Sequence, residues 1–367
     1  MKKLKIATVF SGIGAFEHAL DKKKIPYEVM FACDNGEREL EYTQEQINEI
    51  IANNELSSEQ IKTLIDELYL KTDRVNYVEK TYKANYEINP QDYYQDIRFL
   101  NGAKYKNKVD IFVGGSPCQS FSISGKRLGL EDARGTLFYE YARLVQEIHP
   151  KVFIYENVPG MLSHDNGKTW EIISSIFESL GYEWKLFKLK ATDFGIPQNR
   201  IRIFVLGFRK DQNIDLESVN ISSIPLKTEL KDYLESNVSE LYYHGEKGFK
   251  WITKPLSLKK RVSINGKIAR TQAANQQFNW CGDMIFESIG NRVFSDKIYK
   301  GYYNGEYGVA RKLTPRECLR LMGFNDDFKI VVPDNKMYRQ SGNSIVVNIL
   351  EAIIDSIIET GVFYEKN

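Results

Sequence analysis

The sequence predicts an α/β protein built on a doubly wound, mostly parallel sheet. The chain opens with an apolar run at 5–10, a glycine turn at 11–14 and a helical pattern through Leu20, which is the strand–turn–helix unit that starts such sheets. Short apolar runs then alternate with helical stretches, as expected for parallel strands joined by crossover helices. These runs lie at 28–33, 109–113, 152–155 and 203–206.

Residues 36–75 interrupt this alternation. The stretch 37–74 holds ten acids and four bases. Ser57 and Gln60 stand three apart before an apolar pattern, which predicts a helix that begins with a capping box. We expect an acidic helical insertion, either a plain surface elaboration or a site for a partner.

A second change begins near residue 210. Loops rich in Ser, Asn, Gly and Lys replace the helical alternation until about 310, and order returns with a helix start at Thr314-Pro315. The chain closes on an apolar-faced helix over 345–358. We therefore expect one domain from 1–209 and 339–367, and a second, smaller domain with a hinge from 210–338.

Composition narrows the class of protein. The chain has 367 residues, 42% of them apolar and 27% charged, and no run of 18 apolar residues, so we expect no membrane span. The four cysteines form no C-x-x-C pair and the histidines lack metal-ligand spacing, so we expect neither disulfides nor a metal, and a cytoplasmic setting. Net charge is +1, but residues 247–270 hold eight bases and no acid, which suggests a local polyanion contact.

Cys118 is the first candidate for chemistry. It follows the apolar run 109–113 within Gly114-Gly115-Ser116-Pro117-Cys118. A cysteine in an open loop at a strand end is positioned to attack a substrate, and the glycine pair would let another molecule approach the backbone. A buried structural cysteine is the alternative.

Other candidates lie near the ends of further strands. Glu156 directly follows the run 152–155, and ligands of doubly wound sheets collect at the carboxyl ends of strands, so Glu156 and Cys118 could share a cleft. Arg200 and Arg202 are two apart, so on an extended segment both would face one side and could grip a carbonyl or carboxylate. Salt bridges are the alternative for all three charged residues.

The glycine turn is a candidate nucleoside site. Gly12 and Gly14 supply G-x-G, but Glu17 stands where a dinucleotide fingerprint has its third glycine, and its charge would repel a pyrophosphate. A nucleoside without phosphates, such as S-adenosylmethionine, avoids that repulsion. Asp34, at the end of the second strand, is placed to accept ribose hydroxyl protons. A packing turn and a solvated aspartate are the alternative.

Six short motifs occur in an order that is typical of one enzyme family. They are residues 10–14, 117–119, 156–158, Gln198 with Arg200 and Arg202, 311–323 and 340–344. This ordered set resembles the DNA cytosine-5 methyltransferases, particularly the bacterial enzymes of restriction–modification systems, over residues 4–35, 77–210 and 308–360. The resemblance implies a sheet of the S-adenosylmethionine-dependent methyltransferase type and places a target-recognition domain at 210–338.

The resemblance also implies a mechanism. The Cys118 thiolate would add to C6 of a cytosine flipped out of the duplex, and C5 would then take the methyl group of S-adenosylmethionine without a metal. Glu156 would hold N3 and the exocyclic amine, and Arg202 would hold O2. Arg200 would order the nucleophile and Glu156.

Further contacts follow from matching positions. The implied cofactor contacts are Phe10, Gly12, Gly14, Asp34, Asp96, Ile97, Pro117, Leu137, Asn343 and Ile345. Phe10 would lie against adenine, and Asp96 would accept from its amino group. The loop 119–134 resembles a catalytic lid, whose Gln119 and Ser124 would reach the DNA. Lys259, Lys260 and Arg261 lie outside the matched positions, but because they belong to the acid-free basic stretch 247–270 we expect them to follow phosphates near the target.

These matches imply a monomeric cytoplasmic protein, bacterial or phage-encoded, that acts on double-stranded DNA, with a cognate restriction endonuclease as a possible companion. A cytosine-5 methyltransferase of transfer RNA remains an alternative, although that branch carries a Cys-Phe-Thr triplet that is missing from this sequence. The other alternative is a non-catalytic DNA-binding regulator with an N-terminal helix-turn-helix. Here the glycine turn begins within ten residues of Met1, so we expect no helix-turn-helix before it in this sequence.

Overall fold

The computed structural model describes residues 2–116, 137–277 and 280–364, and its chain divides into two compact units. The first unit comprises Met1–Leu189, Ile201–Ser222 and Glu351–Asn367, and the second comprises Lys190–Arg200 and Ser223–Leu350. These divisions differ from the boundaries expected at 209 and 339. Residues 190–200 stay with the second unit because Asn199 N–H donates to the Ala269 carbonyl at 2.8 Å, and Ala269 N–H donates to that of Pro197 at 2.7 Å.

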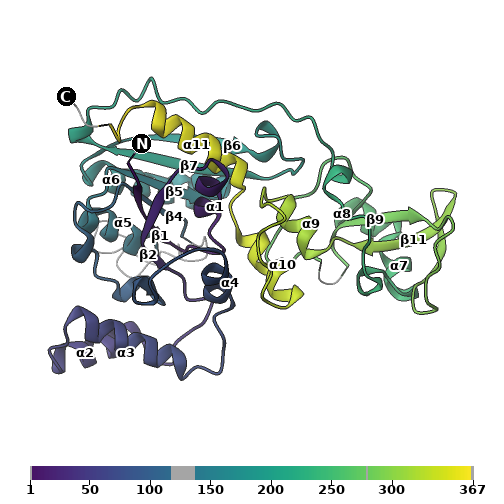
Figure 1. The fold of residues 1–367 in the computed structure, drawn as a ribbon, viewed down its shortest axis with the longest axis horizontal. Coiled ribbons are helices and arrows are strands. Elements are labelled where there is room, and N and C mark those ends of the chain that lie inside the picture. Colours follow the sequence, from purple (N-terminus) through teal and green to yellow (C-terminus); the bar gives the residue numbers. More distant parts are fainter. Residues whose placement is uncertain (1, 117–136, 278–279, 365–367) are drawn as a thin grey trace. The chain divides into compact units, whose positions relative to one another are not determined.

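The first unit is built on a seven-stranded sheet in the order β3-β2-β1-β4-β5-β7-β6 (Figure 1). The strands are β1 (Leu4–Val9), β2 (Tyr27–Cys33), β3 (Tyr93–Tyr94), β4 (Ile111–Gly114), β5 (Val152–Asn157), β6 (Tyr182–Lys190) and β7 (Ile201–Arg209). The pairs among β1 to β5 are parallel, and β7 runs antiparallel to β5. The predicted doubly wound, mostly parallel sheet is confirmed.

Helices cover both faces of this sheet. They are α1 (Ala15–Lys22), α4 (Tyr77–Asn85), α5 (Leu137–Ile148), α6 (Lys168–Ser179) and α11 (Val347–Glu359), whose last residues belong to this unit. Aromatic side chains of α5 and α6 pack in one cluster with Val9 of β1. Side chains alternate along a strand, so Thr8 points to the other face, where its hydroxyl donates to Glu17 of α1 at 3.0 Å. Lys22 joins α1 to α11 through Glu351 at 2.8 Å.

The acidic insertion forms two helices, α2 (Gln44–Asn53) and α3 (Ser58–Leu70) (Figure 1). The predicted capping box is present, with Ser57 Oγ accepting from Gln60 N–H and the Gln60 side chain accepting from Ser57 N–H. The helices share a small apolar core of their own, which includes Ile47 and Ile65. The segment is therefore a folded helical hairpin within the first unit.

The second unit contains more regular structure than expected. A four-stranded sheet has the order β10-β11-β9-β8, from β8 (Val262–Ile264), β9 (Gly282–Ser288), β10 (Gly301–Tyr303) and β11 (Glu306–Lys312). Its helices are α7 (Glu246–Ile252), α8 (Pro255–Lys260), α9 (Pro315–Arg320) and α10 (Asp334–Asn343). The prediction of loops was wrong here because β9 is buried on both faces over Asp283, Met284, Ile285 and Phe286 and so shows no period of two.

Among the described residues, one helical segment, Asp334–Glu359, is long and apolar enough to cross a membrane by length and composition alone. However, 67% of its most apolar window is buried inside the protein, which is the pattern of a core helix.

Candidate active site

The carboxyl ends of β4 and β5 are held together by a small polar network. The Asn157 side chain donates to the Ser116 carbonyl at 3.0 Å and to the Tyr155 hydroxyl at 2.9 Å. The hydroxyls of Ser116 and Tyr155 lie 2.7 Å apart. Asn157 is 3% exposed, so these bonds are shielded from water. The network fixes the backbone that leads from β4 toward Cys118 against the end of β5.

Gly115 allows this close approach. A Cβ built on Gly115 would lie 2.8 Å from Oε2 of Glu156 and 2.9 Å from its carbonyl oxygen, which is closer than real Cβ contacts. At Gly114 an added Cβ would lie 2.7 Å from a methyl group of Val9. The glycine pair therefore makes room for neighbouring parts of the protein, whereas we had expected it to make room for another molecule.

Glu156 and Arg202 form an ion pair at this edge of the sheet. Arg202 Nε lies 3.0 Å from Glu156 Oε1, and the two side chains are 16% and 14% exposed. Such partial burial reduces solvent screening while leaving both groups within reach of a ligand. A carboxylate beside a guanidinium can bind the polar edge of a planar base.

Four of the expected site residues lie outside the described residues: Pro117, Cys118, Gln119 and Ser124. Two of the remaining cysteines, Cys33 and Cys318, are buried, and desolvation raises the pKa of each thiol well above its ordinary value. Neither thiol is available as a thiolate near neutral pH.

The N-terminal glycine turn forms as expected after β1. Phe10, Gly12 and Gly14 all have positive φ angles, of 51°, 54° and 75°. An added Cβ on Gly14 would lie 2.1 Å from the ring of Tyr86, so a glycine is required there, whereas the nearest atom to a Cβ on Gly12 is 4.0 Å away. The turn therefore packs tightly at Gly14 and leaves open space at Gly12.

Asp34 fixes this turn to the end of β2. Its Oδ2 accepts from Gly12 N–H at 2.9 Å, and its Oδ1 accepts from Gly36 N–H at 2.8 Å. Desolvation raises the pKa of Asp34, although these two backbone hydrogen bonds oppose the shift. Asp34 thus joins the two segments that would contact a nucleoside.

We had expected the Glu17 carboxylate to face the glycine turn, but it is buried against other side chains. It is 1% exposed and accepts from Tyr82 Oη at 2.6 Å as well as from Thr8. Desolvation raises the pKa of Glu17 above its ordinary value, so burial disfavours its charged form. Electrostatic repulsion of a phosphate by Glu17 is therefore weaker than the sequence suggested.

Asp96 and Ile97 lie in the loop after β3. Asp96 caps the short 3₁₀ helix Ile97–Phe99 by accepting from Arg98 N–H, and it also pairs with the Arg98 guanidinium at 2.6 Å. Both Asp96 and Ile97 are buried. Leu137 begins α5 and packs against the same core.

Arg200 and Arg202 have different surroundings. Arg200 is 2% exposed, and its guanidinium donates to three carbonyl oxygens of the second unit. These belong to Gln272 at 2.7 Å, Gly342 at 3.2 Å and Ser344 at 2.6 Å. The bonds tie the segment before β7 to the end of α10, next to the expected cofactor contacts Asn343, which is exposed, and Ile345, which is half-buried.

Comparisons with known proteins identify the family. The family model described as C-5 cytosine-specific DNA methylase matches residues 51–359. The chain belongs to this family. It is 36% identical over 284 residues to the type II methyltransferase M1.ScrFI of Lactococcus lactis subsp. cremoris, across 76% of this chain and 69% of that protein. It is 35% identical over 293 residues to the type II methyltransferase M.HhaI of Haemophilus parahaemolyticus, across 77% and 84%.

The fold agrees with that assignment. The crystal structure of S. pombe Dnmt2 methyltransferase superposes with a TM-score of 0.65 at 18% identity, covering 99% of this chain and 100% of that one. The predicted methyltransferase-type fold and the predicted activity are both confirmed, and the protein is a DNA cytosine-5 methyltransferase.

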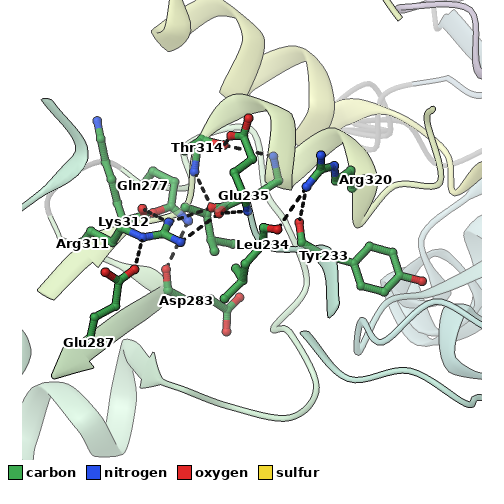
Figure 2. A network of polar contacts seen from close by, with 12 residues as sticks. Tyr233, Leu234, Glu235, Gln277, Asp283, Glu287, Arg311, Lys312, Thr314 and Arg320 are labelled. Atoms are coloured by element: carbon green, nitrogen blue, oxygen red, sulfur yellow. Dashed lines mark hydrogen bonds and ion pairs between the residues drawn. The ribbon is translucent and has the colours of Figure 1, made fainter. Parts of the chain in front are cut away.

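The second unit of the methylase is stabilised by a buried polar network (Figure 2). Arg311 donates to both oxygens of Glu317 at 2.9 Å and to Glu287 at 2.8 Å. Thr314 caps α9 by accepting from Glu317 N–H at 3.1 Å, and its own hydroxyl contacts Glu235. The network joins β9, β11 and α9, so it fixes the small sheet to the helix that follows it.

The basic stretch 247–270 forms α7, α8 and β8. Lys250 pairs with Glu246 at 2.6 Å and Lys267 pairs with Glu229 at 3.0 Å, so part of its charge is compensated. The adjacent Lys259, Lys260 and Arg261 are exposed at the end of α8, and no ion pair involves them within the described residues. Phe249 is 3% exposed and belongs to the core.

Sequence reasoning missed several structural residues of the site. Ser116 and Tyr155 received no role, and Asn157 was quoted only as part of a motif. Polar side chains at adjacent strand ends are a usable signal, because buried polar groups need partners. In residues 2–116, 137–277 and 280–364, no group of three or more His, Cys, Asp or Glu side chains could hold a metal ion.

Proposed function

We propose that this methylase transfers a methyl group from S-adenosylmethionine to C5 of a cytosine flipped out of a specific duplex DNA sequence, through a covalent bond between Cys118 and C6. The observation that carries the proposal is the arrangement at the ends of β4 and β5. Asn157 fixes Ser116, two residues before Cys118, beside the Glu156–Arg202 pair. A nucleophile and a base-binding pair would then act on one ring.

The first unit offers a site that fits the methyl donor. The turn has open space beside Gly12, whose positive φ favours glycine. The Asp34 carboxylate lies at the same place, where it accepts from Gly12 N–H. Phe10 and Asp96 would hold adenine, and Asp34 would hold the ribose. The remaining expected contacts in this unit are Gly14, Ile97, Pro117 and Leu137, and Asn343 and Ile345 of the second unit are expected contacts as well. When bound, S-adenosylmethionine supplies an electrophilic methyl group on a sulfonium sulfur.

The protein residues would act on the cytosine ring in turn. The Cys118 thiolate adds to C6, and Glu156 binds N3 and the exocyclic amine while negative charge develops on the ring. Arg202 donates to O2 and neutralises Glu156. After C5 is methylated, loss of its proton restores the double bond and expels Cys118. Arg200 orders the surrounding backbone through its three carbonyl contacts.

We further propose that the protein acts as the methyltransferase of a restriction–modification pair in the cytoplasm, as a monomer. The relatives M1.ScrFI and M.HhaI are named type II methyltransferases, which supports this setting. Methylation would protect host DNA from a cognate endonuclease that cuts the same sequence. The second unit, with Lys259, Lys260 and Arg261, would read the target.

The test uses the full-length protein, labelled S-adenosylmethionine, and either duplex DNA or transfer RNA. We expect transfer to duplex DNA alone, and bisulfite sequencing of DNA from an expressing host should give one recurring sequence. Cys118→Ser should abolish transfer but retain cofactor binding. Transfer to RNA alone, or cofactor binding without any transfer by the unmodified protein, would overturn the proposal in favour of the transfer-RNA enzyme or the regulator.

A duplex containing 5-fluorocytosine tests the covalent step directly. Fluorine at C5 cannot leave as a proton does, so the bond between Cys118 and C6 should persist as a denaturant-stable complex. The same duplex should give no such complex with Cys118→Ser. Transfer without any trapped complex would disprove the covalent route while leaving the activity intact.

A further inference from the structure

The helical insertion reaches the expected adenine site through Tyr69. This residue lies in the last turn of α3 and is 1% exposed. Its hydroxyl donates to Oδ2 of Asp96 at 2.9 Å. The small core of the insertion also includes Phe99, in the 3₁₀ helix that Asp96 caps. The insertion therefore packs against the loop that would hold adenine.

Asp96 is held by four hydrogen-bond donors. Oδ1 accepts from Arg98 N–H at 3.0 Å and from Arg98 Nε at 2.9 Å, while Oδ2 accepts from Tyr69 and from Arg98 Nη2 at 2.6 Å. A carboxylate has about four acceptor positions, so each is engaged. Arg98 Nε lies within reach of both oxygens, at 2.9 and 3.2 Å. This shared contact can give way to an incoming amino group because Nη2 keeps the ion pair.

Tyr69 itself is fixed by the neck of the insertion. The Arg38 guanidinium lies 4.7 Å from the centre of the Tyr69 ring and donates to the Tyr69 carbonyl at 3.3 Å. Arg38 is 6% exposed and also contacts the side chain of Gln95, adjacent to Asp96. Thr72 Oγ1 donates to the same Tyr69 carbonyl at 2.6 Å. The phenol thus presents its hydroxyl to Asp96 from a buried, well-supported position.

We propose that Tyr69 is a positioning residue of the cofactor site, which holds the Asp96 carboxylate in the orientation that receives the adenine amino group. The inference rests on the proposed function, because it takes Asp96 as the adenine contact. It gives the insertion 36–75 a role in cofactor affinity, where the sequence suggested a surface elaboration or a partner site. Tyr69 acts through Asp96 and touches no reacting atom.

Tyr69→Phe removes the hydroxyl and keeps the packing of the ring. We expect the Kd for S-adenosylhomocysteine and the KM for S-adenosylmethionine to rise about five- to tenfold, which corresponds to the net contribution of one ordinary hydrogen bond. The kcat at saturating cofactor and the KM for DNA should stay unchanged. Tyr42→Phe is the matched control, because Tyr42 belongs to the same insertion and is 46% exposed. It should alter neither constant.

A cycle with Asp96→Asn tests whether Tyr69 acts through the carboxylate. Asp96→Asn should weaken binding of S-adenosylhomocysteine, and Tyr69→Phe should add nothing to that loss. An analogue of S-adenosylhomocysteine with hydrogen in place of the 6-amino group should bind both the parent protein and Tyr69→Phe equally. If the role of Tyr69 were purely structural, Tyr69→Phe would bind both ligands more weakly, and by the same factor.

The outcomes separate the inference from the function. Unchanged cofactor affinity in Tyr69→Phe, equal weakening for both ligands, or a fall in kcat without a rise in KM would each overturn the role of Tyr69 while methylation by the parent protein stands. If the parent protein binds no S-adenosylhomocysteine, the proposed function fails first. If Asp96→Asn binds as tightly as the parent, the inference fails together with the assignment of Asp96.

Discussion

Arg202 meets Glu156 because β7 runs opposite to its neighbour in the sheet. Glu156 lies near the carboxyl end of β5, and Arg202 lies near the amino end of β7, with Glu156 paired to Phe204 in the register. An antiparallel strand begins at the edge where the parallel strands end. The reversed strand therefore brings a cation to the edge at which a doubly wound sheet binds its ligands.

Replacing Glu156 should impair catalysis far more than stability. Glu156→Gln removes the negative charge opposite Arg202 and should lower kcat for methyl transfer by about 10²- to 10⁴-fold, the range of acid–base groups. Circular dichroism melting should change little. Glu183→Gln is the control, because Glu183 lies 4.0 Å from Lys210 and both side chains are more than half exposed. Equal rates for Glu156→Gln and the parent would refute the role of Glu156.

Arg200 should behave mainly as a structural residue. Arg200→Ala leaves the carbonyls of Gln272, Gly342 and Ser344 without their donor, so we expect a loss of about 3 kcal/mol in the free energy of unfolding by urea. Arg292→Ala in the same unit should cost about 0.5 kcal/mol or less, since its side chain is 47% exposed. Arg200→Ala with parental stability but no activity would contradict this assignment.

The sequence predicted the parallel core of the sheet because β1, β2, β4 and β5 are short apolar runs followed by polar turns. It also predicted the capping box at Ser57, which depends on residues three apart, and the helix start at Thr314-Pro315. β6 was missed, although Tyr182, Trp184 and Leu186 alternate with charged residues in a period of two that could have revealed it.

The site was less predictable than the fold because its contacts depend on distant segments. Spacing suggested that Arg200 and Arg202 share one side, but β7 begins at Ile201, between them. Arg200 consequently bonds to carbonyls more than 70 positions away. Likewise, nothing local in residues 36–75 indicated that Tyr69 would contact Asp96, since that pairing depends on how the hairpin folds back.

Breaking the buried pair between Arg311 and Glu317 should destabilise the second unit. The side chains are 1% and 0% exposed, so Glu317→Gln leaves much of the Arg311 charge uncompensated, and we expect a loss of about 3–5 kcal/mol. Differential scanning calorimetry should show that the unfolding transition of the second unit occurs at a lower temperature. Glu229→Gln, which removes the partner of the exposed Lys231 and Lys267, is the control and should leave the transition unchanged. Parental melting of Glu317→Gln would show that the pair contributes little.

Asp283 should make the second unit less stable as pH rises. Burial raises the pKa of Asp283 to about 7, although Arg270 N–H donates to both of its oxygens at 3.2 and 3.0 Å. Between the unfolded pKa of about 3.9 and pH 7 the folded state holds a proton that the unfolded state has lost. Stability should therefore fall as pH rises through this window and level off above it. Asp283→Asn should flatten the decline in urea midpoints from pH 5 to 8.

Asp326→Asn is the control for this titration. A hydrogen bond from the Arg320 side chain lowers the pKa of Asp326. The Asp326 carboxylate therefore contributes to the free energy of unfolding above the unfolded pKa, and this contribution is lost only as pH falls toward the lowered pKa. Between pH 5 and 8 this variant should keep the pH dependence of the parent. A decline that persists in Asp283→Asn would assign the effect to another group.

Lys259, Lys260 and Arg261 should set part of the salt dependence of DNA binding. Each released counterion contributes about 0.9 to the slope of log affinity against log salt, so replacing all three with Gln should reduce the slope by up to about 2.7 if each contacts a phosphate. Fluorescence anisotropy on a duplex between 50 and 200 mM salt, a range in which phosphate contacts change affinity strongly, measures this slope. Replacing the exposed Lys104, Lys106 and Lys108 with Gln removes the same charge from the first unit and is the matched control. Equal slopes for the two triple variants would mean that Lys259, Lys260 and Arg261 contribute only general charge. A smaller slope for the variant of these three residues alone would place the end of α8 on the DNA backbone.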